Sequence, residues 1–154
     1  MTRILFVCLG NICRSPMAEF ALKEMVTREK REDLFQIESA AISDINNDRP
    51  VYREARRKLM EHGIDCTGKY ARQLSASDYA EFDLLIGMDQ ANLRGMRRIC
   101  GGDPEDKIHL LMEYTERPGE IDEPWYTGDF DTAWQDIEDG CRGLLAWLDC
   151  DKGQ

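Results

Sequence analysis

The chain has 154 residues, of which 42% are hydrophobic and 32% charged, and its formal net charge is −10. No apolar run is long enough to cross a membrane, and the negative charge argues against a nucleic-acid-binding face. The apolar run at 4–9 lacks the length and cleavage pattern of a signal peptide, so we expect a cytoplasmic protein forming one domain over residues 1–154.

Short strand-like runs alternate with helical patterns along the chain. The first run, ILFVCL at 4–9, is followed by Ser15-Pro16, a typical helix start, and by apolar residues spaced three and four apart. This pattern predicts a helix over about 16–30, with Ser15 as its capping residue. Further strands are predicted at 35–41, 83–88 and 107–112, and further helices at about 51–62, 90–100 and 130–148.

This alternation, with nearly continuous apolar strands, predicts an α/β fold in which helices cover both faces of a parallel sheet. The stretch 115–128 shows neither the strand nor the helix period. Long ordered loops in compact domains are often functional, so this segment is a candidate part of a site.

The six cysteines are scattered, without a CxxC pair or a secretory signal. We therefore expect free thiols, one of them activated, and no disulfide framework. A metal site is not expected, because neither His62 nor His109 lies at ligand spacing from a cysteine pair.

The stretch CLGNICRS at 8–15 places a cysteine at a strand end, six residues before an arginine. The spacing alone decides nothing, because Cys66 and Arg72 repeat it in CTGKYAR. Only the first copy follows a strand and precedes a helix start. Its glycine and asparagine tolerate unusual backbone angles, so the loop can turn successive N–H groups toward the positive end of the helix and form an oxyanion cradle.

Cys8 lies at the base of this cradle, where the amides, the helix terminus and Arg14 favour the thiolate. The guanidinium of Arg14 matches two oxygens of a phosphate. A thiolate below a bound phosphoryl group can attack phosphorus and give a cysteinyl-phosphate that water hydrolyses, and Ser15 can donate a hydrogen bond to the leaving sulfur. The alternative, a buried packing thiol beside a solvated arginine, does not account for the strand–loop–helix order.

The segment VCLGNICRSPMAE resembles the phosphate loop of the low-molecular-weight protein tyrosine phosphatases, and the resemblance continues through HGIDCTGKYARQLSASD, FDLLIGMDQANLR and EPWYTGDFDTAWQDIEDGCRGLL. It implies a three-layer sandwich with a four-stranded parallel sheet in the order 2-1-3-4, and a phosphotyrosine phosphatase without a cofactor. It also implies Cys8 as nucleophile, Arg14 as transition-state clamp and Ser15 as helper of the thiolate. Asn11 and Ser39 would support the loop, and the phosphate would bind at Leu9, Gly10, Asn11, Ile12, Cys13 and Arg14.

In this family the general acid is an aspartate directly before a proline and an aromatic residue. Here the equivalent segment is DEPWY at 122–126, so the residue before proline is Glu123. Either carboxyl group can protonate a leaving phenoxide, although glutamate is one methylene longer. We expect Glu123 to be the general acid, with Asp122 as the competing candidate.

The resemblance places Ile12, Ile45, Trp125 and Tyr126 around the substrate. The family often has a tryptophan near position 45, so that wall is less aromatic here, whereas Trp125 and Tyr126 can stack on a planar ring. Relatives that hydrolyse arginine phosphate tend to have a small polar residue at the position of Ile12. An apolar Ile12 therefore favours phosphotyrosine.

Cys13 has two interpretations. It is either a packing thiol or the partner that traps oxidised Cys8 as a reversible disulfide, a use known in relatives.

Several functions remain as alternatives: hydrolysis of phosphoarginine or small aryl phosphates, or binding of phosphotyrosine with little turnover. Arsenate reduction is disfavoured, because reductases of this fold need two further cysteines near 70–85 and the chain has none between Cys66 and Cys100. The expected partners are phosphotyrosine proteins and, by family analogy, a tyrosine kinase or its targets, without nucleic acid or membrane. We expect a monomer.

Overall fold

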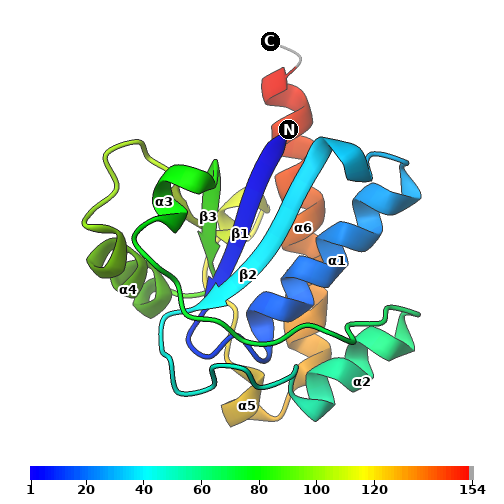
Figure 1. Cartoon of the computed structure of the whole chain (residues 1–154). Helices are drawn as coiled ribbons and strands as arrows, with labels where there is room; N and C mark the ends of the chain where they lie inside the picture. Colours follow the sequence, from blue (N-terminus) through cyan, green and yellow to red (C-terminus); the bar gives the residue numbers. More distant parts are fainter. Residues whose placement is uncertain (153–154) are drawn as a thin grey trace.

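The centre of the molecule is a sheet of four parallel strands (Figure 1). The computed structural model describes the backbone of residues 1–152 and the side chains of residues 1–150. The strands are β1 (Thr2–Cys8), β2 (Phe35–Ala41), β3 (Leu84–Gly87) and β4 (Ile108–Leu110). Their order, β2-β1-β3-β4, confirms the predicted topology. Residues 153 and 154 of the expected domain lie outside the described residues.

Helices cover both faces of this sheet, as predicted (Figure 1). The helices are α1 (Arg14–Arg28), α2 (Arg53–Glu61), α3 (Asp78–Glu81), α4 (Gln90–Cys100), α5 (Pro124–Thr127) and α6 (Phe130–Lys152), with short 3₁₀ turns η1 (Glu32–Leu34) and η2 (Leu111–Tyr114). One face packs against α1, α2 and α6, and the other against α4 and the segment around α3. Among the described residues, no helix has the length and apolar character needed to cross a membrane.

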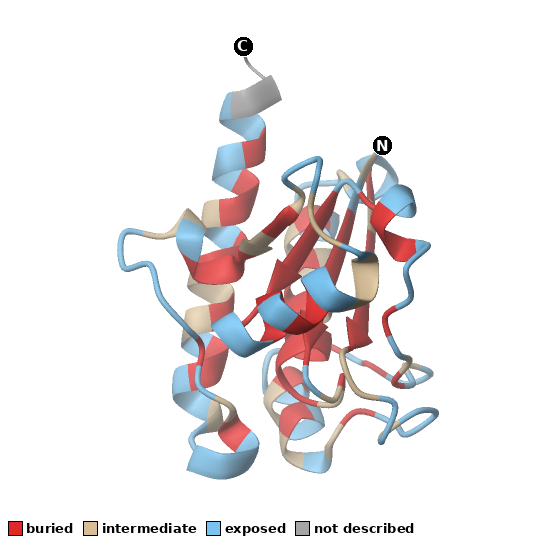
Figure 2. Ribbon diagram, turned by 90° about the vertical axis from the view of Figure 1, so that its left-hand side faces the viewer, coloured by how far each residue is buried: buried red, intermediate tan, exposed pale blue. Residues whose placement is uncertain are grey.

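The central strand β1 alternates its side chains between the two layers of core. Ile4, Phe6 and Cys8 belong to the core beneath α1 and α6, whereas Leu5 and Val7 belong to the core beneath α4. All five are buried, which explains why β1 reads as a continuous apolar run (Figure 2). The same alternation directs Cys8 at the end of the strand toward the N-terminus of α1.

The short elements η1 and α3 were not predicted, and the segments 107–112 and 115–128 differ from their predicted structure. The apolar run at 107–112 is a strand only over Ile108–Leu110, because the chain then turns into η2, where Glu113 Oε1 accepts a hydrogen bond from the Leu110 amide at 3.0 Å. The stretch 115–128 contains the short helix α5, which is too short to show a period in the sequence.

The prediction that Ser15 caps the first helix is wrong. Helix α1 begins at Arg14, with Cys13 at the N-cap position and no side-chain capping hydrogen bond. The hydroxyl of Ser15 lies against Cys8 and Asn11 instead, so it is not available to the backbone amides of the first turn.

Helix α6 packs very closely on the end of η2. A Cβ atom at Gly143 would lie 2.0 Å from the carbonyl oxygen of Tyr114. We expect Gly143→Ala to lower the free energy of unfolding by about 2 kcal/mol, because overpacking against backbone outweighs the gain in helix propensity. Urea unfolding measures the change.

The exchange Ala146→Gly, at an exposed position of the same helix, reports helix propensity alone. A Gly143→Ala variant more stable than the parent would contradict the close approach of α6 and η2.

Candidate active site

The loop of residues 9–13 joins the carboxyl end of β1 to the N-terminus of α1. The chain from β1 leads through α1 to β2 on one side, while β3 lies on the other side of β1. Strand order therefore reverses at this point, and open α/β sheets bind ligands in the crevice at such a reversal. The sheet topology thus opens a site directly above Cys8.

Asn11 holds this loop in its shape. Its backbone is in the left-handed region, with φ of 57°, and its amide N donates to Cys8 Sγ at 3.3 Å. Its side-chain Nδ2 donates to Ser15 Oγ at 2.8 Å and to Ser39 Oγ at 2.9 Å. Its Oδ1 accepts from the amide of Arg72 at 3.2 Å, so three segments of the chain meet at this one buried side chain.

Cys8 is 1% exposed, and its Sγ lies 3.0 Å from Ser15 Oγ. The N-terminus of α1 follows the loop directly, so its free amides and positive end act on the same region. Hydrogen-bond donors and the positive end of a helix therefore converge on Cys8 Sγ.

Arg14 is almost completely buried, at 2% exposed. Its Nη1 donates to Asp89 Oδ2 and to the carbonyl oxygen of Ile121, both at 2.8 Å, and its Nε donates to Glu123 Oε2 at 3.1 Å. Burial alone would lower the pKa of Arg14, but the charges of Cys8, Glu123 and Asp89 together raise it. The guanidinium is therefore a fixed cation beside the sulfur.

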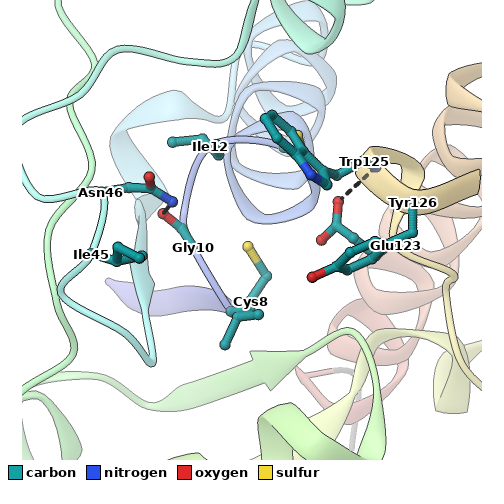
Figure 3. A pocket seen from close by; sticks show the side chains of 10 residues that line it. Cys8, Gly10, Ile12, Ile45, Asn46, Glu123, Trp125 and Tyr126 are labelled. Carbon is teal, nitrogen blue, oxygen red and sulfur yellow. Dashed lines mark hydrogen bonds between the residues drawn. The ribbon is translucent and has the colours of Figure 1, made fainter. Parts of the chain in front are cut away.

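A pocket opens above Cys8, as Figure 3 shows. Ile45 and Asn46 stand on one side of the sulfur, and Glu123 and Tyr126 on the other. The side chains around it are otherwise mostly apolar. The lining residues are Cys8, Leu9, Gly10, Ile12, Cys13, Ile45, Asn46, Glu123, Trp125 and Tyr126.

The two candidate acids point to different places. Glu123 lines the pocket of Cys8, and its other carboxylate oxygen, Oε1, caps α5 by accepting from the Trp125 amide at 3.1 Å. Asp122 lies in a separate small pocket with Asp129, Thr132 and other residues that do not line the pocket above Cys8. The local geometry therefore brings Glu123, not Asp122, to the pocket.

The aromatic rim comes from α5. Trp125 and Tyr126 are 53% and 79% exposed, as suits side chains that meet a ligand from solvent. The ring of Trp125 packs on Tyr52 with centroids 4.6 Å apart, and the Tyr52 amide donates to the carbonyl oxygen of Ile12 at 2.9 Å. Tyr52 thus ties α5 to the phosphate loop, a contact the sequence did not indicate.

Cys13, the last residue of the loop, is buried, at 2% exposed. Burial, followed by the negative charges of Glu123 and Cys8, raises the pKa of the Cys13 thiol. This thiol stays protonated and lacks the reactivity of a thiolate.

Three polar residues of the site were missed in the sequence. Asp89 follows β3, and the carboxyl ends of parallel strands meet at one edge, so its position after that strand was an available signal. Glu19 and Lys69 had no such signal, since a glutamate inside a helix and a lysine in a loop are ordinarily solvated. Both nevertheless lie behind the loop, where Lys69 Nζ is 3.0 Å from Glu19 Oε1.

Comparison with known proteins agrees with this geometry. A family model described as low molecular weight phosphotyrosine protein phosphatase matches residues 3–154. The low molecular weight protein-tyrosine-phosphatase YfkJ of Bacillus subtilis is 36% identical over 99% of both chains. Its crystal structure superposes with a TM-score of 0.95, covering 99% of this chain and 97% of that one.

Two further relatives widen the comparison. The low molecular weight phosphotyrosine protein phosphatase of Sus scrofa is 39% identical over 92% of each chain. The crystal structure of a Drosophila arginine phosphatase is 29% identical, with a TM-score of 0.86 over 96% of this chain and 98% of that one. With its cysteine and arginine at the two ends of the loop between the first strand and the first helix, the chain belongs to the low molecular weight phosphotyrosine protein phosphatase family, whose members are hydrolases.

Proposed function

We propose that the chain hydrolyses phosphotyrosine in proteins, with Cys8 as nucleophile, Arg14 as phosphate clamp and Glu123 as general acid. The observation that carries this proposal is the convergence of the three side chains: Cys8 and Glu123 line one pocket, and the Arg14 Nε lies 3.1 Å from Glu123 Oε2. Family membership supports the same chemistry.

In the first step, the Cys8 thiolate attacks phosphorus from the floor of the pocket. An S–P bond forms, the P–O bond to the tyrosyl oxygen breaks, and its electron pair goes to that oxygen. The carboxyl group of Glu123 supplies the proton that makes the leaving group a neutral phenol. The loop amides and Arg14 stabilise the charge on the transferred phosphoryl oxygens.

In the second step, water attacks the cysteinyl-phosphate. The water gives its proton to the Glu123 carboxylate, the S–P bond breaks, and the electron pair returns to Sγ. Ser15, 3.0 Å from the sulfur, donates a hydrogen bond to the departing thiolate. The products are inorganic phosphate and the enzyme in its starting form.

Glu123 must change partners during this cycle. In the structure its Oε2 accepts from the Arg14 Nε, one of the two donors of a bidentate phosphate clamp. A phosphate that binds this nitrogen takes the place of Oε2, and its negative charge favours protonation of the released carboxyl group. Phosphate binding would thereby prepare the general acid.

The pocket suits an aromatic substrate. Ile12, Trp125 and Tyr126 offer apolar surface above the phosphate loop, where a tyrosine ring can be buried. A phosphoarginine substrate would place a charged guanidinium against the same surface. Phosphoarginine hydrolysis is the second candidate, because the Drosophila arginine phosphatase shares the fold.

A reducing compartment suits this chemistry, since the nucleophile is a thiol. We place the activity in the cytoplasm, on phosphotyrosine proteins, with the chain as a monomer.

Replacing Cys8 with serine tests the nucleophile. We expect Cys8→Ser to abolish phosphate release from a phosphotyrosine peptide, because a serine hydroxyl is a far weaker nucleophile than a thiolate. The wild type should release phosphate from this peptide much faster than from a phosphoarginine peptide. If the wild type released no more phosphate than the variant, the chain would bind phosphotyrosine without hydrolysing it. Faster release from the phosphoarginine peptide would make phosphoarginine the favoured substrate.

Replacing Glu123 with glutamine tests the general acid. We expect Glu123→Gln to slow phenyl phosphate hydrolysis about a hundredfold, because phenoxide needs a proton to leave. Nitrophenyl phosphate should lose less than about tenfold, since nitrophenoxide leaves without one. Asp122→Asn is the matched control and should leave both rates unchanged. Equal losses for the two esters in Glu123→Gln would argue against the assignment.

Alkylation distinguishes the two cysteines of the loop. At pH 7, iodoacetate should modify Cys8, and inorganic phosphate should protect it. Because the pKa of Cys13 is raised, its thiol should stay unmodified as the pH rises from 6 to about 9. Peptide mapping by mass spectrometry checks this, with the exposed Cys150 as internal reference. Rapid modification of Cys13 in a Cys8→Ser variant would contradict the effect of burial on its pKa and favour its second interpretation, a partner of oxidised Cys8.

A further inference from the structure

A carboxylate lies buried behind the phosphate loop, outside the pocket. Glu19 of α1 is 3% exposed. Its Oε1 accepts from Ser39 Oγ at 2.5 Å and lies 3.0 Å from Lys69 Nζ, while its Oε2 accepts from Lys23 Nζ at 2.6 Å. A buried charge with three partners is costly to maintain unless its contacts are well placed.

The carboxylate fixes the direction of a chain of hydrogen bonds. A hydroxyl group has one hydrogen, and Ser39 gives it to Glu19, which can only accept. Ser39 Oγ must therefore accept from Asn11 Nδ2, at 2.9 Å. The amide of Asn11 cannot turn over without losing its bond from the Arg72 amide to Oδ1.

A second branch of hydrogen bonds leads from Asn11 to the sulfur. The second hydrogen on Asn11 Nδ2 goes to Ser15 Oγ at 2.8 Å. Since Ser15 Oγ accepts there, its own hydrogen is free for Cys8 Sγ at 3.0 Å. Asn11 Nδ2 is thus the donor from which two series of hydrogen bonds start, one through Ser39 to Glu19 and the other through Ser15 to Cys8.

We propose that Glu19 and Lys69 are positioning residues that keep Ser15 as a hydrogen-bond donor to Cys8. This inference rests on the proposed function of Cys8. Neither residue lines the pocket, and both act through Ser39 and Asn11. Lys69 holds Glu19 Oε1 in place and also donates to the carbonyl oxygen of Ser39 at 3.0 Å.

The hydrogen bond from Ser15 to Cys8 accelerates the second chemical step. When water displaces Sγ from phosphorus, the S–P electron pair passes to sulfur and the proton of water passes to Glu123. A hydrogen bond from Ser15 stabilises the charge developing on Sγ at that moment. In the first step the sulfur loses charge, so the same hydrogen bond gives no help there.

The two lysines differ in their environments. The side chain of Lys69 is 13% exposed and that of Lys23 is 43% exposed. An exposed ion pair contributes little to stability, whereas breaking a buried one leaves an uncompensated charge inside the protein. Lys69 is therefore the partner that matters, and Lys23→Met should leave catalysis unchanged.

The test replaces the buried pair together, as Glu19→Met with Lys69→Met, so that no unpaired charge is left inside. With nitrophenyl phosphate we expect kcat about tenfold lower and KM lower in parallel, so that kcat/KM changes by less than about twofold. A rapid burst of nitrophenol should precede the slow phase, because the cysteinyl-phosphate accumulates.

Two variants give matched controls. The exposed pair of Glu24 and Arg28 lies on the same helix at 2.9 Å, and Glu24→Met with Arg28→Met should leave kcat and KM unchanged. Glu19→Gln keeps an oxygen that can accept from Ser39, so it should retain kcat within about threefold. The thermal midpoint of each variant, by circular dichroism, reports folding.

The outcomes separate the inference from the proposed function. A wild type that does not hydrolyse the ester contradicts the proposed function. An active wild type with an unchanged kcat in the buried double variant contradicts the inference alone. A rise in KM with a fall in kcat/KM in the double variant would show that the loop is loosened. A loss of kcat in Glu19→Gln as large as in the double variant would show that the effect depends on charge. Either result would overturn the inference.

Discussion

The site depends on the turn at Asn11, where the chain passes from β1 toward α1. Its left-handed backbone, with φ of 57°, is an unfavourable conformation for most residues, and its side chain offsets that cost with bonds to Ser15, Ser39 and Arg72. Without this turn, the loop amides would not face Cys8. The geometry of the loop thus follows from one strained residue, held by the nearby Ser15 and by two distant segments of the chain.

The site also depends on the balance of charge around the buried Arg14. Arg14 is a buried cation that lies between the carboxylates of Asp89 and Glu123, and these offset its loss of solvation. Asp89 also caps α4, where its Oδ1 accepts from the Asn92 amide at 2.8 Å. It is therefore fixed to the scaffold, whereas Glu123 belongs to a surface segment and, in the proposed mechanism, gives up its place to a phosphate.

The sequence was sufficient for the strands and the main helices, because apolar runs and helix periods are local signals. The cysteine loop could be located for the same reason, as a strand, a turn and a helix start in succession. The strand order, which no local signal carries, was implied by the resemblance to a known family. The capping role expected of Ser15 was wrong, because its hydroxyl is used by Cys8 and Asn11, contacts that depend on the folded loop. The buried pair of Glu19 and Lys69 was likewise invisible, since their separation of 50 positions is closed only by the fold.

Glu123 and Trp125 are coupled to each other and to the phosphate loop through helix α5. The carboxylate of Glu123 caps the helix that carries Trp125, and the ring of Trp125 rests on Tyr52, whose backbone is bonded to the phosphate loop. In the proposed mechanism, recognition of a substrate ring and delivery of a proton therefore both depend on the same four-residue helix, α5. Evolution of a new substrate preference in this protein would have to pass through sequences that also alter its rate of leaving-group protonation.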